Sequence, residues 1–163
     1  MRRYIALLLI IPAVLAAAAV ATAAKPKPKA LQLRSTSLGR VLVDSHKHTL
    51  YMLTADGKNV SHCSGACAAN WPPAKAPSKP KLAAGLTKSK FKVIKRSDGS
   101  HQLAYAGHPL YRFIGDSKPG DVNGEGINAF GGLWYVLNKS GTAVTSASAQ
   151  QQPAPAPSPG YGY

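Results

Sequence analysis

The chain of 163 residues carries 20 Lys+Arg against 6 Asp+Glu, which gives a formal net charge of +14. A protein this basic attracts anionic polymers, although charge alone does not specify which polymer. The lysines are scattered except over residues 25–29 and 75–95. No basic helix, aromatic stacking motif or nucleic-acid module accompanies them, which argues against specific nucleic-acid binding.

The first 23 residues have the three parts of an export signal. Arg2 and Arg3 precede an apolar run over residues 4–20, and Ala-Thr-Ala at 21–23 supplies the small-x-small pattern that signal peptidase reads. A retained anchor is the alternative, but a run of about 17 residues is near the lower limit for spanning a bilayer. We therefore predict a cleaved signal peptide over 1–23. The mature protein is expected to be secreted or extracytoplasmic, at the cell envelope, and not integral to the membrane.

No cysteine stands at the predicted cleavage point, so the pattern does not indicate a lipid anchor. Residues 24–37 follow as a Lys/Pro-rich leader, for which we predict an extended conformation without a core of its own. From Gly39 the pattern becomes β. Residues 41–43 and 49–53 read as two short strands around a polar turn at 44–48.

A helical turn is predicted over residues 61–70. Ser61 is suited to cap its start, and alanines favour its interior. Trp71 must end it, because Pro72 and Pro73 follow and a residue before proline avoids the α region.

The second half repeats the β pattern after a loop over residues 74–90 that is rich in Pro, Lys and Ser. A glycine-rich stretch at 115–132 indicates a long irregular loop, and the Ala/Ser/Gln/Pro-rich tail at 140–163 cannot bury a core, so we predict disorder there. Strands are predicted over residues 91–95, 101–105, 109–113 and 133–137, with a hairpin between the first two.

An internal repeat relates the two halves. Each half contains Leu-Tyr-x-[Leu/Phe]-x-x-Asp followed by a long loop and a tryptophan. The tyrosine and the residue two positions later lie on the same face of a strand, so both should face a core. The alternative is an aromatic ligand groove. The corresponding positions are Leu50, Tyr51, Leu53, Asp56 and Trp71 in the first half, and Leu110, Tyr111, Phe113, Asp116 and Trp134 in the second.

Two halves, at about 38–73 and 91–139, are each too small to fold well alone. We therefore predict a mainly β protein with a single compact antiparallel domain over 38–139, one short helical turn and disordered tails. Asp56 and Asp116 each end a strand, where an aspartate usually accepts hydrogen bonds from the following turn. A catalytic carboxylate pair is the alternative reading.

The two cysteines are four residues apart, as Cys63-x-x-x-Cys67. In an exported chain they are expected to pair, and one helical turn places their Cα atoms within disulfide range. The spacing is one residue too long for a thioredoxin-like or c-type haem motif. An alternative joins the cysteines with His46, His48 or His62 in a zinc or copper site or in thiol redox chemistry.

These motifs resemble a family of bacterial secreted proteins and predicted lipoproteins described by a Yx(FWY)xxD motif and a repeat of unknown function. The second copy matches as Tyr111-x-Phe113-x-x-Asp116, whereas the first has Leu53 at the aromatic position. Many members look like lipoproteins, and this chain departs from them by lacking the lipid-bearing cysteine. The resemblance implies an exported, mostly β protein and brings no established activity. It also includes the cysteine turn, Trp71-Pro72-Pro73, Asp98-Gly99, Pro119-Gly120-Asp121 and Gly131-Gly132.

The sequence contains no Ser-His-Asp order, His-Glu-x-x-His helix or phosphate-binding loop, so we predict no enzyme and no cofactor. The main hypothesis is an exported, non-catalytic envelope protein that acts as a binding or structural module. The sequence does not identify a partner: anionic cell-envelope polymers are the candidate that the charge offers, and a basic surface that is only solvated is the preferred alternative. The alternative hypothesis is an envelope protein that binds copper or zinc, or performs thiol redox chemistry, through the cysteine pair.

Overall fold

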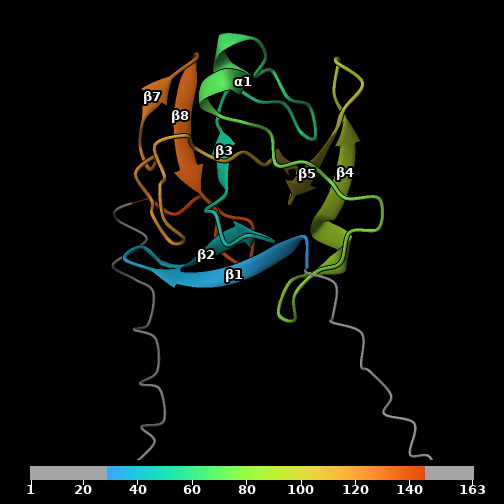
Figure 1. Ribbon diagram of the computed structural model, residues 1–163, viewed down its shortest axis with the longest axis vertical. Coiled ribbons are helices and arrows are strands. Elements are labelled where there is room, and N and C mark those ends of the chain that lie inside the picture. Colours follow the sequence, from blue (N-terminus) through green and yellow to red (C-terminus); the bar gives the residue numbers. More distant parts are fainter. Residues whose placement is uncertain (1–28, 146–163) are drawn as a thin grey trace, which may run out of the picture.

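The computed structural model describes residues 29–145, and the predictions for the signal peptide and for the tail after 145 lie outside them. The described part is mainly β, as predicted, with all strand pairs antiparallel (Figure 1). No helix within 29–145 is long and apolar enough to cross a membrane. The elements are β1 Leu31–Thr36, β2 Gly39–Asp44, β3 Tyr51–Leu53, α1 Ala66–Asn70, the 3₁₀ turn η1 Lys88–Lys90, β4 Phe91–Lys95, β5 His101–Tyr105, β6 His108–Pro109, β7 Asn128–Ala129 and β8 Gly132–Val136.

The ordered domain is larger than predicted at both ends. Residues 24–37 were expected to form a leader without a core, which is wrong for β1, because β1 pairs with β2 along its whole length and Leu31 is fully buried. The Lys/Pro-rich start of this segment hid the alternation of apolar and polar residues within β1. At the other end Val144 is buried and its N–H donates to Val136 O (2.9 Å), so the tail begins later than residue 140.

The two halves exchange strands. β3 of the first half pairs with β8 of the second, with Tyr51 opposite Val136, while Pro73 of the first half bridges to Tyr111 of the second. At the centre Tyr51 N–H donates to Tyr111 O (2.9 Å) and Tyr111 N–H donates to Tyr51 O (3.0 Å). This reciprocal pair relates the repeats by a local pseudo-twofold axis. Figure 1 shows β3 beside β8 in the middle of the molecule.

Two apolar clusters lie on opposite faces of the central strands. Leu50 and Met52 contribute to one cluster, and Tyr51 and Leu53 contribute to the other. This division follows from the period of two along a strand. The prediction that Tyr and the residue two positions later share a core is confirmed in the first copy, and Tyr111 and Phe113 repeat it in the second.

The hairpin of β4 and β5 has the predicted bounds, and the predicted strand at 109–113 is shorter, with β6 ending at Pro109. The predicted helical turn also begins late, at Ala66, with Gly65 at its N-cap and no side-chain cap. Ser61 does not cap it. Instead Ser61 Oγ accepts a hydrogen bond from Arg96 Nη1 (2.6 Å), an interaction between distant segments that the local sequence does not encode.

Candidate functional site

The repeat motif forms the centre of the molecule. Trp71 and Trp134 stack face to face, with ring centroids 3.9 Å apart and planes 3° apart. Tyr51 meets Trp71 edge-on at 5.3 Å, and Tyr111 meets Trp134 in the same way at 5.2 Å. All four side chains are at most 1% exposed. They are core residues, so the alternative of an open aromatic groove is wrong.

Each motif tyrosine binds the aspartate of the other repeat. Tyr51 OH donates to Asp116 Oδ2 (2.7 Å), and Tyr111 OH donates to Asp56 Oδ2 (2.6 Å). Burial raises the pKa of both aspartates, and burial together with the facing carboxylate raises the pKa of both tyrosines. The hydroxyls therefore remain protonated donors over the physiological range. These crossed pairs are the feature of the motif that sequence reasoning missed.

The second oxygen of each aspartate holds the following turn. Asp56 Oδ1 accepts the N–H of His62 (2.7 Å), and Asp116 Oδ1 accepts the N–H of Asn123 (3.0 Å). Backbone capping was the predicted role of these aspartates, and the contacts agree with it. With both oxygens engaged, each carboxylate joins one repeat's strand end to the other repeat's tyrosine.

A family model described as a secreted repeat of unknown function matches residues 33–75 and 92–138, the two segments that carry these contacts. The chain belongs to this family. Each matched segment of this secreted-repeat protein supplies one motif tyrosine, one motif tryptophan and one half of the exchanged pairing. The aspartate at 56 and the one at 116 both fall inside the matched segments. No curated protein and no solved structure matches the chain.

The cysteine turn is a disulfide, as predicted. Cys63 and Cys67 are bonded with Cα atoms 5.2 Å apart, and both are buried. The chain has no other cysteine, so thiolate is not available for the alternative metal or redox set. His62 lies beside this turn, where its Nδ1 is 2.8 Å from Ala55 O.

The histidines at 46 and 48 lie elsewhere, in the turn after β2, whereas α1, which contains Cys67, lies at the opposite end of the molecule (Figure 1). The alternative metal set of three histidines and two cysteines is therefore not assembled. The turn places the two imidazoles with Asp44, which sequence reasoning left out of the candidate set. The every-second-residue pattern Asp-x-His-x-His was the available signal for this residue.

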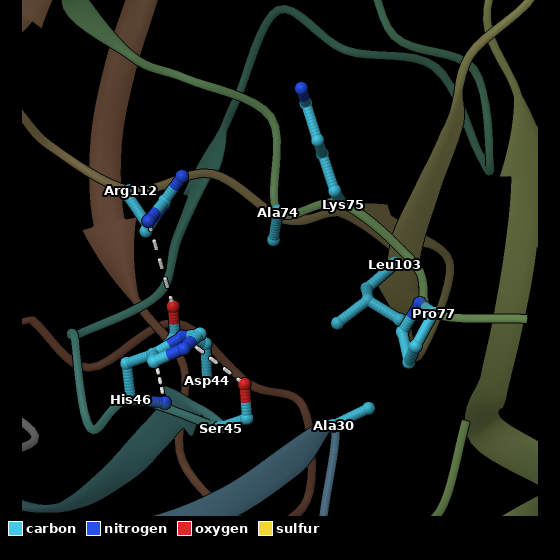
Figure 2. Close-up of a pocket in the computed structure, with 9 residues that line it drawn as sticks. All are labelled: Ala30, Asp44, Ser45, His46, Ala74, Lys75, Pro77, Leu103 and Arg112. Carbon is cyan, nitrogen blue, oxygen red and sulfur yellow. Dashed lines mark hydrogen bonds and ion pairs between the residues drawn. The ribbon is translucent and has the colours of Figure 1, made fainter. Parts of the chain in front are cut away.

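A cavity of about 230 Å³ adjoins that turn. Figure 2 shows its polar side, where Arg112 points toward Asp44, and its apolar side, where Leu103 and Pro77 face Ala30. Arg112 Nη1 lies 4.0 Å from Asp44 Oδ2. The remaining lining residues are Ser45, His46, Ala74 and Lys75.

A second hollow, the lysine cleft, has a volume of about 490 Å³ and lies where the two halves meet. Lys58 enters it from the turn after β3, and Lys90 and Lys92 enter from η1 and β4. The backbone contact from Asn59 N–H to Gly107 O (2.7 Å) joins the two sides. All three lysines are exposed, so their ammonium groups can contact a solvent-borne ligand.

Gly107 lines the cleft and lies against the side chain of Lys58. Its φ of +92° belongs to the region that favours glycine, and a Cβ there would stand 3.2 Å from Lys58 Cγ. Lys90 is further positioned by a hydrogen bond from its Nζ to Ser140 O (2.8 Å). Sequence reasoning noted the lysines between 75 and 95 but had no means of bringing Lys58 to them.

Proposed function

We propose that this protein is a non-catalytic extracytoplasmic module, without a lipid anchor, that binds an anionic polymer of the cell envelope through the lysine cleft. The observation that carries the proposal is the convergence of Lys58, Lys90 and Lys92 from both halves on one hollow. A phosphate-bearing chain lying there would meet three ammonium groups within a single site. Removal of the predicted signal peptide takes away Arg2 and Arg3 and leaves 18 Lys+Arg against 6 Asp+Glu, a net charge of +12 that would also steer such a polymer toward the surface.

The motif residues support a structural rather than a catalytic role for the repeat. Asp56 and Asp116 each accept one tyrosine hydroxyl and one backbone N–H. Carboxylates held in this way at the junction of two repeats stabilise the junction. The exposed surface between the halves then remains available to bind a ligand. Membership of a secreted family is consistent with a ligand outside the cytoplasm.

The test is binding of the mature protein to synthetic poly(glycerol phosphate), measured by isothermal titration calorimetry. We expect affinity to fall steeply as NaCl rises from about 50 to about 500 mM, because salt screens exposed charges. The triple variant Lys58→Ala, Lys90→Ala, Lys92→Ala is expected to lose about tenfold or more in affinity, since each exposed charge contact is worth up to about 1 kcal/mol.

A matched control removes the same charge elsewhere. Lys79, Lys118 and Lys139 are also exposed and lie outside the cleft, so their triple alanine variant has the same net charge. Equal losses of affinity in the two variants would show that binding follows total charge and would overturn the proposal that the cleft is the binding site. Binding confined to vesicles of anionic lipid, with none to the polymer, would replace the proposed ligand with a membrane surface.

A further inference from the structure

The turn between β2 and β3 is held by one carboxylate. Asp44, at the end of β2, is 8% exposed, and its Oδ1 accepts the backbone N–H groups of both His46 (2.8 Å) and His48 (3.0 Å). Lys47 between them has φ 73° and its N–H donates to Asp44 O (3.1 Å), which reverses the chain. The two histidines are therefore fixed on one tight turn.

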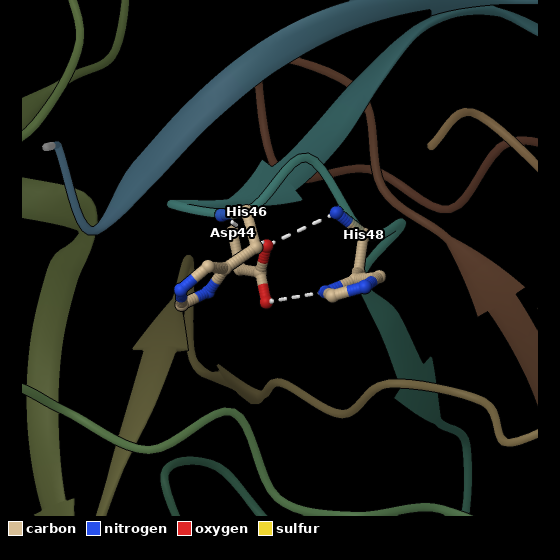
Figure 3. A group of neighbouring side chains, drawn as sticks. All are labelled: Asp44, His46 and His48. Carbon is tan, nitrogen blue, oxygen red and sulfur yellow. Dashed lines mark hydrogen bonds and ion pairs between the residues drawn. The ribbon is translucent and has the colours of Figure 1, made fainter. Parts of the chain in front are cut away.

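The other oxygen of Asp44 faces an imidazole. Asp44 Oδ2 and His48 Nδ1 are 3.2 Å apart, and Figure 3 shows the two imidazoles flanking the carboxylate. Two ligands on one tetrahedral zinc ion, with bonds of about 2.0 Å, are separated by about 3.3 Å. The oxygen and nitrogen thus already have the separation of two ligands of one ion. A metal bonded to both atoms would replace the proton that joins them and would lie to one side of the line between them.

His46 supplies the third donor. One ligand atom from each of Asp44, His46 and His48 lies within 4.8 Å of the other two. The ring centroids of the histidines are 6.1 Å apart, and two imidazoles on one tetrahedral ion are about 5 Å apart. His46 is exposed, so rotation of its side chain closes this difference without moving the backbone.

We propose that Asp44, His46 and His48 form a binding site for a divalent transition-metal ion, zinc or copper. Two imidazoles and one carboxylate suit both ions, and the general order of stability predicts tighter binding of copper(II) than of zinc. The proposed site contains no sulfur and is separate from the disulfide and from the lysine cleft. It is therefore independent of the polymer-binding proposal.

The surroundings leave the site open to solvent-accessible spaces on two sides. His46 lines the 230 Å³ cavity, and His48 lines a neighbouring hollow of about 250 Å³, so the ion would stand between two solvent-accessible spaces. A fourth position would be taken by water or by a ligand in the cavity. Arg112 lines both spaces and lies 4.0 Å from Asp44 Oδ2, where its positive charge opposes a bound cation.

The proposal is tested by calorimetric titration of the metal-free mature protein, purified without a polyhistidine tag, with zinc chloride and with copper(II) sulfate. We expect one ion per chain, and a loss of about tenfold or more in affinity for His46→Ala and for His48→Ala. His101→Ala is the matched control, because His101 is exposed on β5 away from the turn. It should bind as the parent protein does.

A variant that is expected to strengthen metal binding separates a metal site from a merely structural role of the turn. Arg112→Gln removes the opposing charge and should tighten binding several-fold, whereas a loss of turn structure would only weaken it. Copper(II) electron paramagnetic resonance should show two coordinated nitrogens in the parent protein and one in His46→Ala. Absence of binding, unchanged affinity in His46→Ala, or an equal loss in His101→Ala would overturn the site.

Discussion

The loops that close the two repeats begin and end alike but are built differently. Each starts at the motif aspartate and returns to the motif tryptophan, and the aspartate holds His62 in one loop and Asn123 in the other. The first loop then continues through a disulfide and α1. The second contains glycines and the short β7 instead. The same crossed framework therefore accepts two unrelated ways of closing a loop.

The residues that follow His62 and Asn123 show why the loops differ. The first is Cys63, which is bonded to Cys67, and the second is Gly124, which lies against the aromatic centre. A Cβ on Gly124 would approach Trp71 Cη2 to 2.7 Å, and its N–H donates to Tyr51 OH (3.2 Å). One loop is tied by a covalent bond, and the other by close contact of its backbone with the core.

The largest effects should come from the shared framework. Trp71→Ala and Trp134→Ala each remove a fully buried ring from one stack, and each should lower the free energy of unfolding by about 3–5 kcal/mol. Urea unfolding followed by circular dichroism measures both. Similar losses are expected because the rings are related by the pseudo-twofold axis. A loss confined to one variant would show that one repeat folds without the other.

The disulfide should matter less than the stack. Replacing Cys63 and Cys67 together by alanine removes a very short cross-link, whose entropic contribution is about 2 kcal/mol. The variant should unfold cooperatively, at lower urea, and should be insensitive to reductant. Reduced parent protein provides the control and should match it. Complete loss of folding would contradict the comparison, because the second loop closes without any disulfide.

The two motif tyrosine hydroxyls should contribute slightly different amounts to the free energy of unfolding. Tyr51→Phe removes the donor to Asp116 Oδ2 and the acceptor of the Gly124 N–H. It should lower the free energy of unfolding by about 1–2 kcal/mol. Tyr111→Phe removes the donor to Asp56 Oδ2 and the contact with Ser61 Oγ (2.7 Å), but Ser61 Oγ still accepts the hydrogen bond from Arg96. The free energy of unfolding of Tyr111→Phe should therefore fall by less, about 1 kcal/mol. Thermal unfolding of both variants beside the parent measures the order, and a reversed order would contradict this account.

The smallest effect is a pH dependence confined to the second loop. Burial raises the pKa of Glu125 from 4.5 to about 7, its Oε2 accepts the N–H of Val136 (2.7 Å), and its Oε1 has no hydrogen-bond partner within the described residues. Above pH 4.5 the unfolded chain releases a proton that the folded chain keeps until about pH 7. Stability should therefore fall as pH rises through this window and level off above it.

Glu125→Gln keeps the size of the side chain and removes the charge. It should be neutral near pH 4 and stabilising by about 1 kcal/mol near pH 8, after allowance for solvent screening of a half-exposed group. Denaturant unfolding at the two pH values measures the difference. Asp98→Asn is a control, because Asp98 is exposed and the pKa of its carboxyl is lowered by hydrogen bonds from Ser100. A stabilisation that is the same at both pH values would contradict the prediction.

The sequence by itself determined the class of the fold, the repeat, the family and the disulfide. These depend on local patterns: the period of two around Tyr51 and Tyr111, the spacing of Cys63 and Cys67, and the proline pair that ends α1. Each can be read within about ten residues, where chain geometry restricts the outcome.

Only the tertiary structure decided which half supplies each partner. The tyrosine of one repeat binds the aspartate of the other, 65 residues away for Tyr51 and Asp116. The tertiary structure likewise brings Lys58 to the same cleft as Lys90 and makes β1 part of the core. Hydrogen bonding and burial depend on distance in space, and two related repeats offer every residue both an internal and a crossed partner. The exchange of strands across the Tyr51–Tyr111 axis selected the crossed one.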